Sequence, residues 1–311
     1  MGNKVTVVGA GNVGSNTARR IAEKDLTDEV VMIDIVEGLP QGLALDINQS
    51  APVEGFVSHV TGTNDYADTA GSDVCVITAG LPRQSGMSRM DLLDKNAAIV
   101  GGVTEALAKN SPDAVIIVVS NPLDEMTFLT ALVSGFPKER VMGMAGVLDS
   151  SRLRYFISEK LDVAPPSVEA MTLGSHGDQM VALPRHATVN GKPLPELVDE
   201  AELEELFQRT RDGGAEIVGY LKKGSAFYAP SSSVTAMVRS ILTDSNDVHP
   251  TCAWTTGQYG VSDVYLGVPA KLGKGGVTEI IELDLNDDEL AELKEAAEAI
   301  RTKCDELAAR R

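Results

Sequence analysis

The chain has 311 residues, 43% of them hydrophobic, which suffices for one large or two ordinary domains with a sizeable core. Its 45 acidic and 27 basic residues give a formal net charge of −18, which excludes the basic surface that nucleic-acid binding requires. No apolar run approaches the ~20 residues of a membrane span, and the first residues lack the charged and apolar regions of a signal peptide. We therefore expect a cytoplasmic protein with no membrane or nucleic-acid partner.

The acidic excess has two interpretations. One is a solvated surface suited to high salt, where screening suppresses the repulsion between like charges. The other is the ordinary acidic surface of a globular protein, and the sequence leaves both open.

The cysteines carry no structural or catalytic pattern. Cys75, Cys252 and Cys304 are sparse and scattered, which fits neither a disulfide framework nor a metal site. We expect small apolar residues in a reducing compartment, and no metal.

Short apolar runs alternate with amphipathic stretches in the first half of the chain. The helical patterns include 13–24 and 91–109, and they lie between runs rich in Val and Ile that are bounded by turn residues. Strands separated by helices predict right-handed crossovers and a parallel sheet. The fold class is therefore α/β, with a Rossmann-type doubly wound sheet in residues 1–146. The predicted strands are 4–8, 29–33, 57–62, 73–78 and 114–119.

The second half, residues 147–311, has a different pattern that predicts an α+β substrate or catalytic domain. Asn190-Gly191 is a strong signal for a hairpin turn. In the closing helix Leu290, Leu293, Ala297 and Ile300 fall on one face. The predicted helices are 150–161, 201–223, 231–242 and 287–307, and the predicted strands are 168–173, 186–189, 251–258, 263–269 and 277–282.

The first strand runs into a glycine-rich turn of the form Gly-x-Gly-x-x-Gly. Gly9 permits a tight turn, Gly11 lets the backbone approach a pyrophosphate, and Gly14 lets the helix pack closely on the sheet. The helix N-terminus offers free N–H groups to the anion. The pattern predicts a dinucleotide site formed by the whole turn, Gly9, Ala10, Gly11, Asn12, Val13 and Gly14. A glycine-rich turn with no ligand is the alternative.

Asp34 ends the second predicted strand, 20 residues after Gly14. A carboxylate there can accept hydrogen bonds from the adenosine ribose hydroxyls and would repel a 2′-phosphate. This position predicts NAD rather than NADP as the cofactor. A solvated acid at the end of a strand is the alternative.

His176 is the one histidine of four that lies in a glycine-framed turn directly after a buried strand. An imidazole can remove the alcohol proton near neutral pH when a hydride leaves carbon. Asp149 can orient this histidine, and Arg152, three residues later on the same helical face, can bind a carboxylate through two hydrogen bonds. A structural loop histidine, an N-cap aspartate and a surface arginine are the alternatives.

Two further segments follow strands at the carboxyl edge of the predicted sheet, where such folds bind ligands. After the fourth strand, Pro82 and Gly86 mark a loop that can close as a lid and that carries Arg83 and Arg89. After the fifth strand, Asn121 can hydrogen-bond a substrate oxygen, or cap the helix that follows.

Taken together, these segments resemble the lactate/malate dehydrogenase family over nearly the whole chain and in the same order. The matching strings are GAGNVG, Asp34, AGLPRQSGMSR, SNPLD, VLDSSRLR and GSHGD. The resemblance implies that His176 exchanges the proton with Asp149 as its partner, that Arg152 binds the substrate carboxylate and that Arg89 polarises the carbonyl. It also implies NAD contacts from Asn96 and from the turn formed by Val119, Ser120 and Asn121.

Arg83 bears on the substrate. In the family's lactate enzymes this position is typically Gln and in its malate enzymes Arg, which can pair with the second carboxylate of oxaloacetate. The surrounding string resembles the lactate-dehydrogenase-like malate dehydrogenases of bacteria and archaea. The stretch 224–230, which should wall the pocket, lacks the Thr of lactate enzymes.

The resemblance implies reversible NAD-dependent oxidation of (S)-malate to oxaloacetate, as in the tricarboxylic acid cycle, by a homodimer or homotetramer. The alternatives are an L-lactate dehydrogenase and, in a different class, an NAD-binding protein without turnover.

Overall fold

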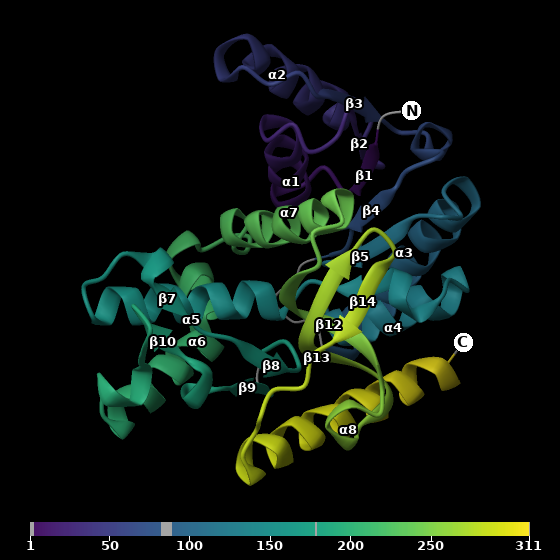
Figure 1. Ribbon diagram of the computed structural model, residues 1–311. Coiled ribbons are helices and arrows are strands. Elements are labelled where there is room, and N and C mark those ends of the chain that lie inside the picture. Colours follow the sequence, from purple (N-terminus) through teal and green to yellow (C-terminus); the bar gives the residue numbers. More distant parts are fainter. Residues whose placement is uncertain (1–2, 82–88, 178, 311) are drawn as a thin grey trace.

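The computed structural model describes residues 3–81, 89–177 and 179–310. Its main sheet places six parallel strands in the order β3-β2-β1-β4-β5-β6. Helices connect these strands and cover the sheet (Figure 1). The strands are β1 (Lys4–Val8), β2 (Glu29–Ile33), β3 (His59–Thr63), β4 (Val74–Ile77), β5 (Val115–Val118) and β6 (Val141–Gly143). The helices are α1 (Asn12–Glu23), α2 (Leu39–Glu54), α3 (Arg89–Asn110), α4 (Leu123–Ser134) and α5 (Gly146–Lys160).

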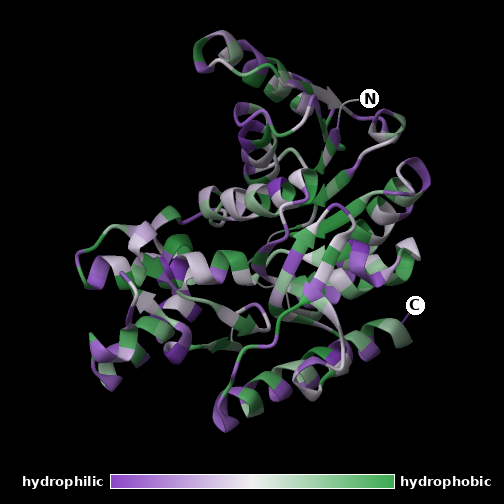
Figure 2. Ribbon diagram, in the orientation of Figure 1, coloured by the Kyte–Doolittle hydropathy of each residue, from purple (hydrophilic) through white to green (hydrophobic). Residues whose placement is uncertain are grey.

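The parallel strands are apolar throughout because both of their faces are buried. In β4, Val74 and Val76 pack into one hydrophobic cluster, whereas Cys75 and Ile77 pack into the other. Alternate residues of a strand point to opposite faces, so a continuous apolar run is what a doubly covered sheet requires. Figure 2 shows this hydrophobic interior, with polar residues on the outer faces of the helices. The predicted Rossmann-type sheet is confirmed.

The second half continues the same sheet with antiparallel strands in the order β12-β13-β8-β9, and β12 pairs with β6. Helix α7 packs against α1, and α8 packs against α4 (Figure 1). The strands are β7 (Val168–Glu169), β8 (Thr172–Gly174), β9 (Met180–Ala182), β10 (Thr188–Val189), β11 (Lys192–Pro193), β12 (Asp247–Thr256), β13 (Ser262–Gly273) and β14 (Gly276–Ile280). The helices are α6 (Glu200–Leu221), α7 (Tyr228–Thr243) and α8 (Asp287–Ala309).

Two local predictions meet different outcomes. The hairpin turn is confirmed, because Asn190 and Gly191 have φ values of 51° and 77° between the paired strands β10 and β11. The single strand expected over 168–173 is wrong. It is two strands, since β7 joins a small sheet with β10 while β8 enters the main sheet beside β13.

The predicted boundary at residue 146 falls where α5 begins. The main sheet continues across this point, so the division into two domains stays a prediction. Among the helices of residues 3–81, 89–177 and 179–310, none is long and apolar enough to cross a membrane. Cys75, Cys252 and Cys304 are buried and free.

Candidate active site

The glycine-rich turn lies between the end of β1 and the start of α1. Gly9 has a φ of +99°, which favours glycine. A Cβ on Gly14 would lie 1.8 Å from the carbonyl oxygen of Gly9, so a side chain there would push the helix off the turn. Around Gly11, by contrast, an added Cβ would have no atom of the described residues within 4 Å beyond its chain neighbours. The turn therefore packs tightly at Gly14 and leaves open space at Gly11.

Asp34 lies half-buried directly after β2 and holds the same turn. Its Oδ2 accepts a hydrogen bond from the backbone N–H of Ala10 at 2.7 Å, and its Oδ1 accepts one from Val36 at 3.0 Å. The first turn of α1 has no side-chain cap, so its N–H groups stay available to an anion.

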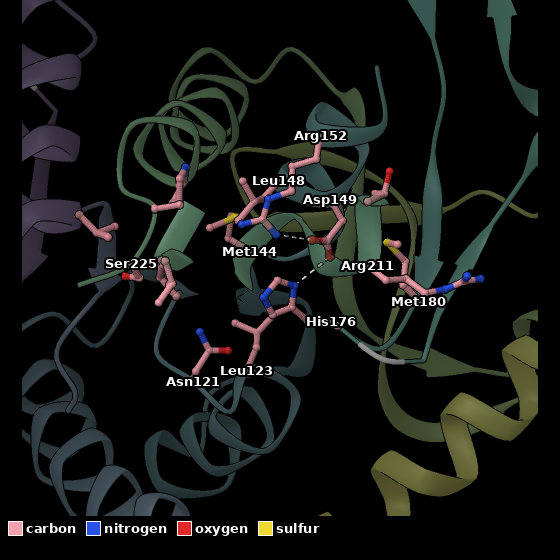
Figure 3. Close-up of a pocket in the computed structure, with 18 residues that line it drawn as sticks. Asn121, Leu123, Met144, Leu148, Asp149, Arg152, His176, Met180, Arg211 and Ser225 are labelled. Atoms are coloured by element: carbon pink, nitrogen blue, oxygen red, sulfur yellow. Dashed lines mark hydrogen bonds and ion pairs between the residues drawn. The ribbon is translucent and has the colours of Figure 1, made fainter. Parts of the chain in front are cut away.

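His176, Asp149 and Arg152 form a connected group, as Figure 3 shows. His176 Nδ1 lies 2.8 Å from Asp149 Oδ2, and Arg152 Nη1 donates to Asp149 Oδ1 at 3.2 Å. The interpretation of Asp149 as an N-cap is wrong, because α5 begins at Gly146 and the buried Asp149 lies inside its first turns. Arg152 is not a surface arginine either, since its side chain is only 13% exposed.

The charges of this group act on the imidazole. The negative charge of Asp149 raises the pKa of His176 above its ordinary value, while burial and the positive charge of Arg152 oppose the rise. Because Nδ1 faces Asp149, Nε2 is the ring nitrogen that can exchange a proton with a ligand.

These side chains line a cavity of about 300 Å³ between the glycine turn and the second half of the chain. Val13, Val119 and Asn121, all predicted site residues, line the same cavity. The helix-capping interpretation of Asn121 is not supported, because the N-cap position of α4 belongs to Pro122. A cavity that joins a histidine, an arginine and an amide can hold a small hydroxy acid.

Two other predicted cofactor residues support the site's backbone. The amide of Asn96 is buried, accepts from the N–H of Leu81 at 2.8 Å and donates to the carbonyl of Asn121 at 2.6 Å. Ser120 donates its hydroxyl to the carbonyl of Ala79 at 2.6 Å. Both side chains join the segments after β4 and β5, and direct contact with the cofactor stays a prediction.

Of the two loop arginines, only Arg89 lies within the described backbone. Arg83 lies outside the described residues, together with Pro82 and Gly86. Arg89 is the first residue of α3, so its backbone starts the helix that follows the loop. The roles of both arginines stay predictions.

Gly213 and Gly214, which lie inside α6, are not among the residues predicted from the sequence. A Cβ on Gly213 would lie 3.1 Å from Cδ of Arg152, and one on Gly214 would lie 3.6 Å from its Nη2. Glycine inside a helix costs about 1 kcal/mol relative to alanine, and here it leaves room for the arginine. A pair of glycines within a helical pattern was the available signal. Nε of Arg152 is buried without a hydrogen-bond partner among the described residues, as expected of a guanidinium that binds an anionic ligand.

Two family models match the chain. The lactate/malate dehydrogenase NAD-binding domain matches residues 3–143, and the lactate/malate dehydrogenase α/β C-terminal domain matches residues 146–310. Together the two matches span nearly the whole chain.

Similar proteins agree with these matches. A malate dehydrogenase of Salinibacter ruber is 54% identical over 304 residues, covering 98% of this chain and 96% of that protein. One of Chloroherpeton thalassium is 51% identical, with 98% of each chain covered.

Solved structures extend the likeness to three dimensions. The Salinibacter ruber malate dehydrogenase has a TM-score of 0.94 at 52% identity, with 98% of each chain covered. A Cryptosporidium parvum lactate dehydrogenase, solved with lactic acid and NAD, has a TM-score of 0.95 at 40% identity and covers 99% of this chain and 98% of that one. The chain therefore belongs to the lactate/malate dehydrogenase family.

Proposed function

We propose that this chain is an NAD-dependent malate dehydrogenase, which catalyses the reversible oxidation of (S)-malate to oxaloacetate. The observation that carries the proposal is the group of His176, Asp149 and Arg152 on one cavity, with 2.8 Å between the imidazole and the Asp149 carboxylate. The malate dehydrogenases at 54% and 51% identity support this choice of substrate within the family.

The residues after β1 and β2 fit NAD. The uncapped first turn of α1 and the open space at Gly11 suit a pyrophosphate, and the carboxylate of Asp34 suits ribose hydroxyls. NAD bound there would supply the hydride acceptor for malate oxidation and, as NADH, the hydride donor for oxaloacetate reduction.

The first step that the chain's own residues carry out is the transfer of a proton by His176. His176 accepts the hydroxyl proton of malate on Nε2 during oxidation and donates it back during reduction. Asp149 holds the ring by Nδ1 and stabilises the imidazolium, so it fixes both the orientation and the protonation of the base. Malate oxidation needs neutral His176 and rises with pH, whereas oxaloacetate reduction needs the imidazolium and falls as pH rises.

Arginines hold the substrate. Arg152 binds the carboxylate next to the reacting carbon through two parallel hydrogen bonds, and the room left by Gly213 lets its guanidinium take that place. Asn121 donates its amide to the substrate oxygen. We assign polarisation of the carbonyl to Arg89 and binding of the second carboxylate to Arg83.

The test is oxaloacetate turnover, followed by the loss of NADH absorbance. We expect turnover in the wild type, and in His176→Asn a kcat lower by about 10²–10⁴-fold with nearly unchanged NADH affinity. His186→Asn is the matched control, because His186 is half-buried and its Nε2 lies 3.0 Å from the backbone carbonyl of Asp284, so the variant should keep the wild-type rate. A wild type without turnover, or a His176→Asn variant with more than about a tenth of the wild-type kcat, overturns the proposal.

We place this activity in the cytoplasm and in the tricarboxylic acid cycle, with a homodimer or homotetramer as the working form. Exposed apolar side chains on and beside α2 support self-association, because contact with a second copy would remove them from water. They include Leu45, Val53 and Val57, which are 59%, 86% and 88% exposed.

A further inference from the structure

Asp124 is a buried carboxylate that the mechanism above does not use. It lies in the first turn of α4 and is only 4% exposed. Its Oδ2 accepts a hydrogen bond from Ser175 Oγ at 2.6 Å, and its Oδ1 accepts one from Cys252 Sγ at 3.3 Å. These contacts join α4 of the first half to β12 and to the segment after β8 in the second half.

The segment after β8 carries the proposed base. Ser175 and His176 are neighbours in a short turn that returns to β9, and Gly177 has a φ of +102°. The Ser175 side chain is held by Asp124, and the His176 side chain is held by Asp149. Two adjacent residues of one turn are thus each fixed by a different buried carboxylate, one from α4 and one from α5.

Asp124 is surrounded by hydrogen-bond donors. The Ser175 hydroxyl and the Cys252 thiol both donate to its carboxylate, and the N-terminus of α4 adds a favourable dipole. Burial raises the pKa of Asp124, while the hydrogen bonds from Ser175 and Cys252, the charge of His176 and its backbone N–H act against the rise. Burial raises the pKa of the Cys252 thiol far above its ordinary range, so the thiol stays a donor.

The charges of two carboxylates act on the imidazole of His176. Asp149 and Asp124 both favour its protonated form, and Arg152 of α5 opposes it. On the side of α8, burial and the charges of Glu125 and Asp124 raise the pKa of the Cys304 thiol. Lys303 pairs with Glu125 at 3.9 Å.

We propose that Asp124 is a positioning residue for the proton transfer: it holds the Ser175–His176 turn in place, and its charge helps to keep the proton on the imidazole. This inference rests on the proposed function of His176 as the acid and base. Through Asp124, a residue of the first half of the chain fixes the turn in the second half that carries His176.

The test is the pH profile of Asp124→Asn in both reaction directions. Loss of the charge should move the midpoint of the alkaline fall in oxaloacetate reduction to lower pH by about half a unit or more. The acid-side midpoint of malate oxidation should move in the same direction. Near pH 8 a shift of half a unit lowers the protonated fraction of His176, and with it kcat in reduction, by up to about threefold. NADH affinity should be unchanged, whereas a merely structural defect would lower both directions without moving either midpoint.

Two further variants complete the design. Glu289→Gln, another buried carboxylate changed to an amide but placed in the capping box of α8, should keep the wild-type midpoints. Ser175→Ala removes the hydroxyl and keeps the charge, so kcat should fall several-fold in both directions at unchanged NADH affinity. If Asp124→Asn does not fold, Ser175→Ala still tests the contact by which Asp124 fixes the turn, and an unchanged kcat overturns the inference.

The outcomes separate the inference from the proposed function. A wild type that does not reduce oxaloacetate overturns the function itself. An active wild type overturns the inference alone if Asp124→Asn keeps both midpoints, or if Ser175→Ala keeps the wild-type kcat.

Discussion

Asp34 shows how one side chain can hold the backbone and remain available to a ligand. Each of its carboxylate oxygens accepts a backbone N–H, from Ala10 and from Val36, yet the side chain stays half-exposed at the sheet edge. A carboxylate has about four acceptor sites, so two of them remain for ribose hydroxyls.

Asp34→Ser should therefore weaken NADH binding and narrow the difference between the NADH and NADPH affinities, because the charge that repels a 2′-phosphate is gone. Dissociation constants for both nucleotides, measured by fluorescence titration, check this. Asp113→Ser, an exposed aspartate before β5, is the matched control and should bind both as the wild type does. An Asp34→Ser variant with the full preference for NADH would show that another group selects the cofactor.

At the residue scale, the sequence was informative where spacing or a motif fixes the neighbours. Asp149 and Arg152 are three apart on one helix, and His176 stands in a glycine-framed turn, so all three could be named before the fold was known. Asp124 was not singled out as a site residue, because its contacts with Ser175 and Cys252 span 51 and 128 residues. Such contacts exist only after the chain has folded.

In the turn between β1 and α1, Gly14 is required for packing and Gly11 leaves space for the cofactor. An added methyl group at Gly14 would meet the carbonyl of Gly9 at 1.8 Å, whereas one at Gly11 would meet no atom beyond its chain neighbours within 4 Å in the part of the chain that the structure describes. Gly11 also has an ordinary φ of −70°.

We expect Gly14→Ala to lower the free energy of unfolding by about 1–3 kcal/mol, as overpacking typically does, and to weaken NADH binding as a consequence. Gly11→Ala should keep the wild-type stability and still weaken NADH binding, because the methyl group occupies the space for the pyrophosphate. Thermal or urea unfolding together with NADH titration measures both effects. Equal stability of the two variants would contradict this division of roles.

Elements were predictable where their pattern is simple. The apolar runs of β1, β2, β4 and β5 and the one-sided apolar face of α8 are such cases. Helix α2 contains Pro40, Gly42 and Pro52, which obscure a helical signal, yet Pro40 is tolerated in its first turn and Pro52 lies near its end. Helix α4 is buried on nearly all sides, so it lacks the alternation of polar and apolar faces that marks a surface helix.

For the whole molecule, the net charge of −18 is the property with the broadest consequence. Repulsion among surface carboxylates opposes the compact state, and salt screens it because the Debye length falls from about 10 Å at 0.1 M to about 3 Å at 1 M. If the acidic surface is an adaptation to high salt, the thermal midpoint should rise from low to molar KCl, and the oligomer should become more stable.

Differential scanning calorimetry and light scattering across the salt series measure the two quantities. A flat or falling midpoint would favour the other interpretation, an ordinary acidic surface.

The substrate is decided by kcat/KM for oxaloacetate and for pyruvate, measured with NADH on the same preparation. The proposed function predicts that oxaloacetate is preferred by at least about a hundredfold, because a closing site that contains an arginine for a second carboxylate leaves that charge unpaired against a methyl group. Arg83→Gln should reduce this ratio by about two to three and a half decades, the equivalent of about 3–5 kcal/mol for a broken desolvated pair. A wild-type chain that uses pyruvate as efficiently as oxaloacetate would contradict the assignment of malate as the substrate.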